Sequence, residues 1–418
     1  MNKDIILFKK IEDCCGCGTC QLICPRKAIS MKKDKYGFFY PVINKSQCIS
    51  CGKCQKICAF QNNKEKDHIQ KVYALSLKDN NLIQKTASGG VFGGIAKQWI
   101  NDGGVVFGVA LIKERDCLSI KHCKASTNEE LIKLLGSKYV QSDLSNTLSE
   151  TKQLLDAGEK VLFSGTPCQI AGLNAYLKKD YENLLTIDLV CHGVPNQEMF
   201  NSYIKNEESR LHKPIQDFKF RDKENGWGLN ARIYYGCESK CESKIIKSNC
   251  SSYYQLFLNG DIYRESCYHC PYTNEHHPAD LTIGDFWGIE EEHPIFLSPN
   301  GKLEKSKGVS MIMINNDKGE KFFNLAKNLF WCYPSTFKNV AKHNEQLKHP
   351  SRPGKNRDVV LNLYHNHGYK TVDKWFWRQK KNEKTKEKIK YHLHNDIPKP
   401  IRQIGKEVFN QIRNITRR

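Results

Sequence analysis

The chain has 418 residues, of which 39% are hydrophobic and 26% are charged, values typical of a soluble protein with more than one domain. It contains no run of about 18 apolar residues, which excludes a transmembrane helix, and its N-terminus lacks the apolar stretch of a signal peptide. We therefore expect a cytoplasmic protein. In that reducing compartment, 19 cysteines indicate metal ligands or catalytic groups rather than disulfides.

The first sixty residues contain a cysteine pattern that occurs twice. Cys14, Cys17, Cys20 and Cys24 follow the spacing C-x2-C-x2-C-x3-C, and it is repeated by Cys48, Cys51, Cys54 and Cys58. This is the spacing of bacterial ferredoxins, in which the fourth cysteine of each run ligates the other cluster. One [4Fe–4S] cluster is therefore assigned to Cys14, Cys17, Cys20 and Cys58. The other is assigned to Cys48, Cys51, Cys54 and Cys24. A pair of zinc sites is the alternative.

Two details depart from the usual ferredoxin pattern. Cys15 is an extra thiol in the first run, which we interpret as a non-ligand, and Cys58 is followed by Ala59 where proline is usual. Between the runs, alternating apolar residues on both sides of residues 35–37 predict a hairpin. We assign residues 1–62 to a ferredoxin-like domain and the polar residues 63–72 to a linker.

The next part of the chain alternates strand-like and helix-like segments. Residues 72–111 predict one β–α–β unit and residues 160–191 predict another, which favours a mostly parallel α/β sheet. Later segments at 218–222, 228–236 and 280–288 are more typical of antiparallel strands.

Ser88, Gly89 and Gly90 open the first of these predicted helices. Free N–H groups at a helix start, with glycines that allow close approach, suit a pyrophosphate. The alternative is that the glycines only permit close packing, and the segment lacks the GxGxxG pattern of a Rossmann site.

Four further cysteines form a second constellation. Cys168 follows a predicted strand, Cys191 ends the neighbouring strand, and Cys267 and Cys270 form a CxxC turn. Strand ends at one edge of a parallel sheet lie close together, so four thiolates can meet there. They would suit a third [4Fe–4S] cluster or a zinc ion, and a redox-active CxxC pair is a further alternative.

Seven motifs in order resemble the coenzyme F-420 hydrogenase/dehydrogenase beta-subunit family. They are TASGG at 86–90, GSKYVQS at 136–142, SGTPCQIAGL at 164–173, DLVCHGVP at 188–195, FRDKENGW at 220–227, CYHC at 267–270 and ADLTIGDFWG at 279–288. A fused ferredoxin module is known among relatives. The resemblance implies that residues 73–345 form an α/β flavin-binding domain with a mixed sheet, which holds FAD and the third cluster.

The resemblance also implies roles for single residues. Ser88, Gly89 and Gly90 would bind the FAD phosphates, and the motif with Lys138, Tyr139, Gln141 and Ser142 would lie against the flavin. His192 would donate a proton near the flavin or only tune the adjacent cluster. Arg221, Lys223 and Trp227 are candidates for substrate or cofactor contacts, and Asp285 for a place in the site. Phe286 and Trp287 are expected to be structural.

The implied function is an iron–sulfur flavoprotein oxidoreductase. It would act on an unidentified organic substrate or on F-420, and exchange electrons with a redox partner protein or a small-molecule donor. The alternative is an electron-transfer subunit without its own substrate. Lysine and asparagine richness resembles bacterial members described alongside polysaccharide biosynthesis.

The C-terminal extension, residues 346–418, is basic. The chain carries a net charge of +20, and residues 371–418 hold 14 Lys/Arg against 5 Asp/Glu. Such a tail favours an anionic partner, although a solvated basic surface explains it equally; nucleic acid is the least favoured partner. Apolar residues from Ile401 to Ile415 at steps of three or four predict an amphipathic helix, which would dock on the protein or lie on the inner membrane face.

Overall fold

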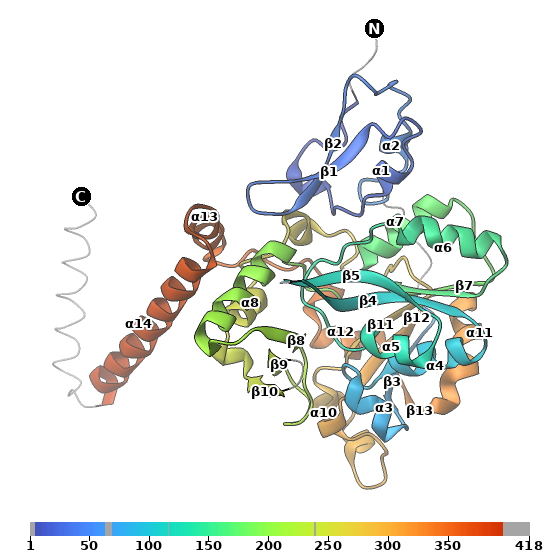
Figure 1. Cartoon of the computed structure of the whole chain (residues 1–418). Helices are drawn as coiled ribbons and strands as arrows, with labels where there is room; N and C mark the ends of the chain where they lie inside the picture. The colour runs from blue at the N-terminus through green and yellow to red at the C-terminus, as the bar shows by residue number, and fades with distance from the viewer. Residues whose placement is uncertain (1–4, 63–68, 116, 238–239, 396–418) are drawn as a thin grey trace.

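The computed structural model describes residues 5–62, 69–115, 117–237 and 240–395. A small N-terminal domain stands on a larger central domain, and helices α13 (Arg357–His367) and α14 (Tyr369–Asn395) extend from one side (Figure 1). The amphipathic helix predicted from Ile401 to Ile415 lies outside the described residues. Within these ranges, no helix combines the length and the apolar character that crossing a bilayer requires.

The N-terminal domain consists of short helices around one hairpin. Its elements are η1 (Ile11–Asp13), α1 (Thr19–Leu22), β1 (Ile29–Lys33), β2 (Phe39–Ile43) and α2 (Lys53–Lys56). Strands β1 and β2 pair antiparallel, and the Asp34 carboxylate accepts the backbone N–H groups of Tyr36 and Phe38 at 2.9 and 2.8 Å. These two bonds close the turn, and the hairpin predicted from the alternating pattern is confirmed.

An eight-stranded sheet forms the centre of the molecule. Its strands, in sheet order, are β13 (Phe330–Ser335), β3 (Lys71–Leu77), β12 (Ser310–Ile314), β11 (Leu281–Asp285), β7 (Leu184–Leu189), β6 (Val161–Gly165), β4 (Val105–Glu114) and β5 (Cys117–Ala125). Only the neighbours from β11 to β4 are parallel, which is three of the seven pairings. The expectation of a mostly parallel sheet is wrong, because β5 returns directly from β4 and β12 returns beside β11 without a crossover helix.

The predicted β–α–β units have different outcomes. Strands β6 and β7 are parallel neighbours joined by α7 (Pro167–Leu177), as predicted. Strands β3 and β4 do not pair, because four strands lie between them. The segment 280–288 contains β11, which pairs antiparallel with β12 but parallel with β7.

Helices cover both faces of this sheet. One face packs against α4 (Val91–Asn101), α5 (Asn128–Leu134) and α11 (Asp317–Ala326). Part of the other face packs against α6 (Thr147–Asp156) and α7. Neighbouring residues such as Leu162 and Phe163 belong to different cores because side chains alternate along a strand. The result is a three-layer α/β arrangement with a mixed sheet.

A further core lies beside β5. It is built from a three-stranded antiparallel sheet, α8 (Gln197–Leu211), α9 (Ser252–Leu258) and the two C-terminal helices. The strands of this sheet are β8 (Ile215–Lys219), β9 (Ala231–Cys237) and β10 (Lys240–Ile246). Val360, Leu361 and Val372 are fully buried in this core, so the first part of the C-terminal extension packs on the protein itself.

The remaining elements are short. They are α3 (Asn80–Lys85), η2 (Ser248–Cys250), η3 (Glu265–His269), α10 (Ile289–Glu292), η4 (Pro294–Leu297), η5 (Lys305–Lys307), η6 (Lys327–Leu329), α12 (Phe337–Lys342) and η7 (Glu345–Leu347).

Candidate functional site

The eight ferredoxin-like cysteines gather around two small cavities. We call Cys14, Cys17, Cys20 and Cys58 the inner set, and these thiols line one cavity. Burial raises the pKa of Cys14 to about 11, although Arg264 opposes this, and the charges of Cys17 and Cys58 add to the increase. We call Cys24, Cys48, Cys51 and Cys54 the outer set, and these thiols line the second cavity. In each set, one cysteine comes from the other run.

Four further thiols converge between the N-terminal domain and the sheet, and we call them the third set. Cys168 lies in the first turn of α7 and Cys191 lies just beyond β7, while Cys267 and Cys270 lie at η3. Burial raises the pKa of Cys191, and the charges of Cys267, Cys168 and Cys270 raise it further. The structure therefore brings together the four cysteines of the second predicted constellation.

In the described part of the chain, no cysteine set brings three thiol sulfurs within 4.8 Å of one another. Among the described residues, the only group of three metal-binding side chains with ligand atoms all within 4.8 Å of one another is Glu291, Glu292 and His343. A tetrahedral zinc site needs ligands at about 2.3 Å from the ion, so its sulfurs lie closer than this. The wider spacing accords with clusters of several metal ions.

Cys15 is buried between the inner and third sets. Hydrogen bonds to Cys168 and Cys17, together with burial, raise the pKa of its thiol. The bond from Cys15 lowers the pKa of Cys17 to about 6. The inner set packs closely on α7, the helix that carries Cys168. A Cβ atom on Gly172 of this helix would lie 3.2 Å from Cys17 Sγ.

A cavity of about 350 Å³ opens next to the third set. Its size is within the range of ligand-binding pockets in proteins, about 300–1,000 Å³. Among the residues singled out from the sequence, those that line it are Ser88, Gly90, Lys138, Tyr139, Gln141, Ser142, Cys168, Cys191, His192, Arg221, Asp285 and Trp287. Gly89, Lys223, Trp227 and Phe286 do not line it. Cys168 and Cys191 of the third set thus border the same cavity as most of the predicted FAD-binding residues, whereas Cys267 and Cys270 do not line it.

The start of α4 faces this cavity. Gly90, Val91, Phe92 and Gly93 line it, and the first N–H groups of a helix have no partner within the helix. Ser88 Oγ instead donates to the Val309 carbonyl at 2.8 Å, and the Gly89 N–H donates to Ser310 Oγ at 2.8 Å. These two groups hold the loop against β12, so the N–H groups that remain for a phosphate are those of the first turn.

Lys223 holds the same loop in place through two hydrogen bonds. Its ammonium donates to the carbonyl oxygens of Ile83 and Ser88 at 2.8 and 2.5 Å. Burial lowers the pKa of Lys223 to about 7. Lys223 therefore positions the segment that leads into α4 and does not reach the cavity.

The motif at residues 136–142 forms another part of the wall. Lys138 Nζ donates to the carbonyls of Leu135 and Lys133, at 2.7 and 3.2 Å, and so caps the end of α5. The Tyr139 ring stacks on Phe257 with centroids 4.6 Å apart. The motif begins at Gly136, which has a φ of +80° and no heavy atom within 4 Å of where a Cβ would stand.

Gln141 and Ser142 have partners on the protein side of the wall. Gln141 Nε2 donates to the Cys15 carbonyl at 3.0 Å, which ties the motif to the N-terminal domain. Ser142 Oγ lies 3.0 Å from His122 Nδ1, and Gln169 Nε2 donates to Ser142 Oγ at 3.0 Å. Burial lowers the pKa of His122 to about 4, so its imidazole is neutral at pH 7. Sequence reasoning missed His122, which lies in no quoted motif, and Gln169, which lies in the motif at 164–173 but was not singled out.

A buried ion pair forms a further part of the cavity wall. Arg221 Nη1 lies 2.5 Å from Asp285 Oδ2, and Trp227 Nε1 donates to Asp285 Oδ1 at 2.8 Å. Although burial alone would lower the pKa of Arg221, the neighbouring Asp285 carboxylate holds it above its usual value. Arg221 Nη2 is buried without a hydrogen-bond partner among the described residues. A ligand with an acceptor oxygen or nitrogen would satisfy it.

The aromatic residues of this wall have different positions. Trp287 faces the cavity and stacks on Trp227, with centroids 4.6 Å apart and planes at 7°. Phe286 is completely buried in the core beneath β11. His192 is exposed and lines the cavity beside Cys191.

Two family comparisons cover much of the chain. Residues 158–330 match the family described as the C terminus of the coenzyme F420 hydrogenase/dehydrogenase beta subunit, and residues 13–62 match the 4Fe-4S dicluster domain. Residues 158–330 are therefore similar to the coenzyme F420 hydrogenase/dehydrogenase beta-subunit family, and a 4Fe-4S dicluster domain precedes them in the same chain. The chain is accordingly an iron–sulfur protein that is similar to an oxidoreductase family.

Comparisons with single proteins add less. A chain of the F420-reducing [NiFe] hydrogenase complex from Methanosarcina barkeri, in a xenon-derivatised structure, is 14% identical with a TM-score of 0.40. The match covers 76% of this chain and 94% of that chain. A likeness of this size identifies no function. No curated protein matches the chain.

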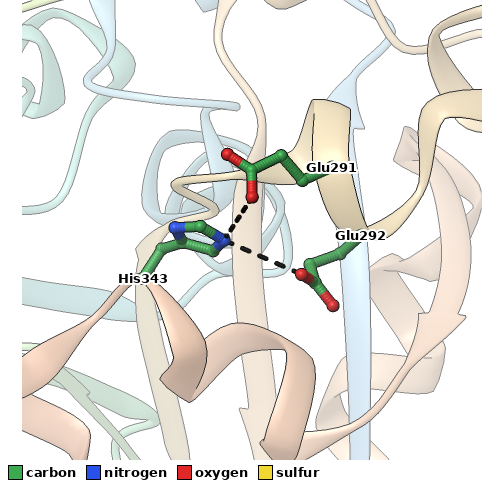
Figure 2. A group of neighbouring side chains, drawn as sticks. All are labelled: Glu291, Glu292 and His343. Atoms are coloured by element: carbon green, nitrogen blue, oxygen red, sulfur yellow. Dashed lines mark ion pairs between the residues drawn. The ribbon is translucent and has the colours of Figure 1, made fainter.

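The group Glu291, Glu292 and His343 lies outside the cavity wall. Figure 2 shows the imidazole between the two carboxylates, with His343 Nε2 3.4 Å from Glu291 and 3.7 Å from Glu292. The Glu291 side chain is 60% exposed, and Glu292 also pairs with Lys342. This is an ion-pair group at the surface between α10 and α12.

Proposed function

We propose that this protein is an iron–sulfur flavoprotein oxidoreductase in which the 350 Å³ cavity holds FAD beside the third cysteine set. The observation that carries the proposal is the shared wall: Cys168 and Cys191 border the same space as Arg221 and the start of α4. FAD, when bound, exchanges electron pairs as hydride with organic molecules and single electrons with iron–sulfur centres.

The residues around the cavity fit such a ligand. The first turn of α4 offers N–H groups to a pyrophosphate, and the unpartnered Arg221 Nη2 offers a donor to a ring oxygen or nitrogen. Gly136 leaves open space where any side chain would intrude. The unidentified organic substrate or deazaflavin would meet the flavin at this cavity, with His192 as the candidate proton donor.

The three cysteine sets would hold three [4Fe–4S] clusters in order from the surface to the cavity. Cys51 of the outer set is exposed, whereas the inner set packs on α7 and the third set borders the cavity. An external redox partner or small-molecule donor would therefore meet the outer set first. The alternative, an electron-transfer subunit without its own substrate, has the same sets but does not need the cavity.

Cofactor analysis of the anaerobically purified protein tests the proposal. We expect about one FAD and about twelve iron atoms per chain, because three four-iron clusters are proposed. Reduced F-420, NADH and reduced ferredoxin would then be tried as electron donors. About eight iron atoms without flavin would contradict the proposal and leave the electron-transfer alternative.

A pair of glycine variants locates the flavin. Gly136 and Gly103 both have a φ near +80°, and a Cβ on either would meet no heavy atom within 4 Å, but only Gly136 lines the cavity. Gly136→Ala and Gly103→Ala should therefore each lower the free energy of unfolding by about 1–2 kcal/mol. Only Gly136→Ala should reduce the flavin content. Equal flavin content in both variants would contradict FAD binding in this cavity.

A further inference from the structure

Arg264 reaches from the central domain into the N-terminal domain, where it contacts Cys14 of the inner set. Its residue surface is only 1% exposed. The guanidinium donates to the Cys14 carbonyl through Nε and to the Phe39 carbonyl through Nη2, both at 2.9 Å. Nη2 also lies 3.9 Å from Cys14 Sγ. A positive charge is thus held against a thiol of the inner set by a residue 250 positions away.

The fit around this guanidinium is close. The Tyr40 ring lies 4.0 Å from the guanidinium carbon, in cation–π geometry. A Cβ atom on Gly16 would lie 2.9 Å from the guanidinium carbon, and Gly16 has a φ of +72°. Gln141 Oε1 accepts from Nη1 at 3.4 Å. None of these neighbouring groups carries a charge.

Arg264 has no carboxylate within 4.0 Å in the described part of the chain. The adjacent Glu265 pairs instead with Arg357 at 2.7 Å. Burying a cation without a counter-charge is strongly unfavourable, so a negative group must compensate it. The thiolates of the inner set, with the cluster they would hold, are the negative group in contact with Arg264.

Among the described residues, no buried charged side chain borders the outer set. Arg26 and Lys53 border it, but both are exposed, so water and salt screen them. Cys51 of that set is itself exposed. The two sets have the same cysteine spacing and differ in their electrostatic surroundings. Net charge, hydrogen bonding and solvent exposure are the factors that set the reduction potential of an iron–sulfur cluster.

We propose that Arg264 is a positioning residue that raises the reduction potential of the inner cluster above that of the outer cluster. Reduction adds one electron and makes the cluster more negative, and no bond forms or breaks. The buried guanidinium stabilises that added charge, so an electron shared between the two clusters rests on the inner one. The inference rests on the proposed function only for the destination of that electron, the cavity beyond the third set.

Potentiometric titration followed by electron paramagnetic resonance tests this inference. Arg264→Gln should lower the midpoint of the inner cluster and leave that of the outer cluster unchanged. We expect the equilibrium constant for electron transfer from the outer to the inner cluster to fall about tenfold or more. A tenfold fall corresponds to a change of 59 mV in the difference between the two midpoints for a one-electron couple. Cys51→Ala removes a ligand of the outer set, so the electron paramagnetic resonance signal that it changes belongs to the outer cluster.

Two further variants separate charge from folding. Arg264→Lys keeps the positive charge but loses the paired hydrogen bonds to the Cys14 and Phe39 carbonyls. The midpoint of the inner cluster should therefore stay close to the wild-type value. Gln141→Glu keeps Arg264 and places a carboxylate beside Nη1, so it should lower the inner midpoint even if Arg264→Gln fails to fold.

The outcomes are distinct. An unchanged inner midpoint in Arg264→Gln and Gln141→Glu, at full iron content, would overturn the inference. Equal losses in Arg264→Gln and Arg264→Lys would also overturn it, because geometry rather than charge would then be responsible. Failure of the proposed function would appear separately, as wild-type protein without flavin or without the third cluster.

Discussion

The N-terminal and central domains assemble their cysteine sets in different ways. Each N-terminal set takes three thiols from one run and the fourth from the other, all within residues 14–58. The third set joins the first turn of α7, the end of β7 and the segment η3, and the adjacent cavity draws on residues from 86 to 344. A locally encoded site depends on the conformation of two loops, whereas the third set depends on the whole sheet.

This comparison predicts that loss of a thiol has different consequences in the two regions. Cys168→Ala should lower the iron content from about twelve to about eight atoms per chain and also reduce flavin binding, because Cys168 lines the cavity. Cys51→Ala should reduce iron but leave flavin in place. Iron, sulfide and flavin analysis of anaerobic protein measures both.

Cys332→Ala is the control for this pair. Cys332 is half-buried on β13 and belongs to none of the three sets, so iron and flavin should both stay at the wild-type level. Twelve iron atoms in Cys168→Ala would exclude Cys168 as a ligand.

Loss of the buried ion pair in the cavity wall should destabilise the central domain and leave the N-terminal domain intact. Arg221→Met leaves the Asp285 carboxylate buried with the Trp227 indole N–H as its hydrogen-bond partner. Removing one partner of a buried pair costs about 3–5 kcal/mol, so the central domain should unfold at lower denaturant concentration and lose flavin. The iron of the N-terminal domain should be retained through this loss.

The double variant Arg221→Met/Asp285→Asn sharpens the result. It removes both charges and should recover part of the lost stability, but not the flavin, because the donor that faces the cavity stays absent. Recovery of flavin in the double variant would contradict a direct role for Arg221 in binding.

The smallest expected effect concerns pH and the loop beneath α4. Burial lowers the pKa of Lys223 to about 7, whereas an unfolded lysine titrates near 10.4. Between about pH 7 and about pH 10 the unfolded chain binds the extra proton, so Lys223 makes the free energy of unfolding rise as the pH increases. Lys223→Met should flatten this rise, measured as the denaturant midpoint at several pH values.

Lys213→Met serves as the matched lysine variant. Lys213 is exposed and pairs with Glu242 on β10, so its loss should leave the rise between pH 7 and pH 10 in place. An equal slope in wild type and Lys223→Met would show that Lys223 is charged in the folded protein.

The sequence alone determined the features that depend on neighbouring residues. Cysteine spacing predicted the composition of the inner and outer sets that the structure brings together, and alternation predicted the hairpin of β1 and β2. The placement of Cys168 and Cys191 just beyond strands was also predicted, although their meeting depends on the pairing of β6 with β7. The first two features follow from local geometry, because a few backbone angles decide them.

Only the tertiary structure decided how these parts meet. Cys15 was interpreted as an extra thiol, but it is buried between Cys17 and Cys168. Gln141 belongs to a motif expected beside the flavin, yet it bonds to the Cys15 carbonyl. Arg264 was not singled out, because no motif marks it and its contact with Cys14 spans 250 positions. Contacts of this kind depend on how the two domains pack, which no local pattern encodes.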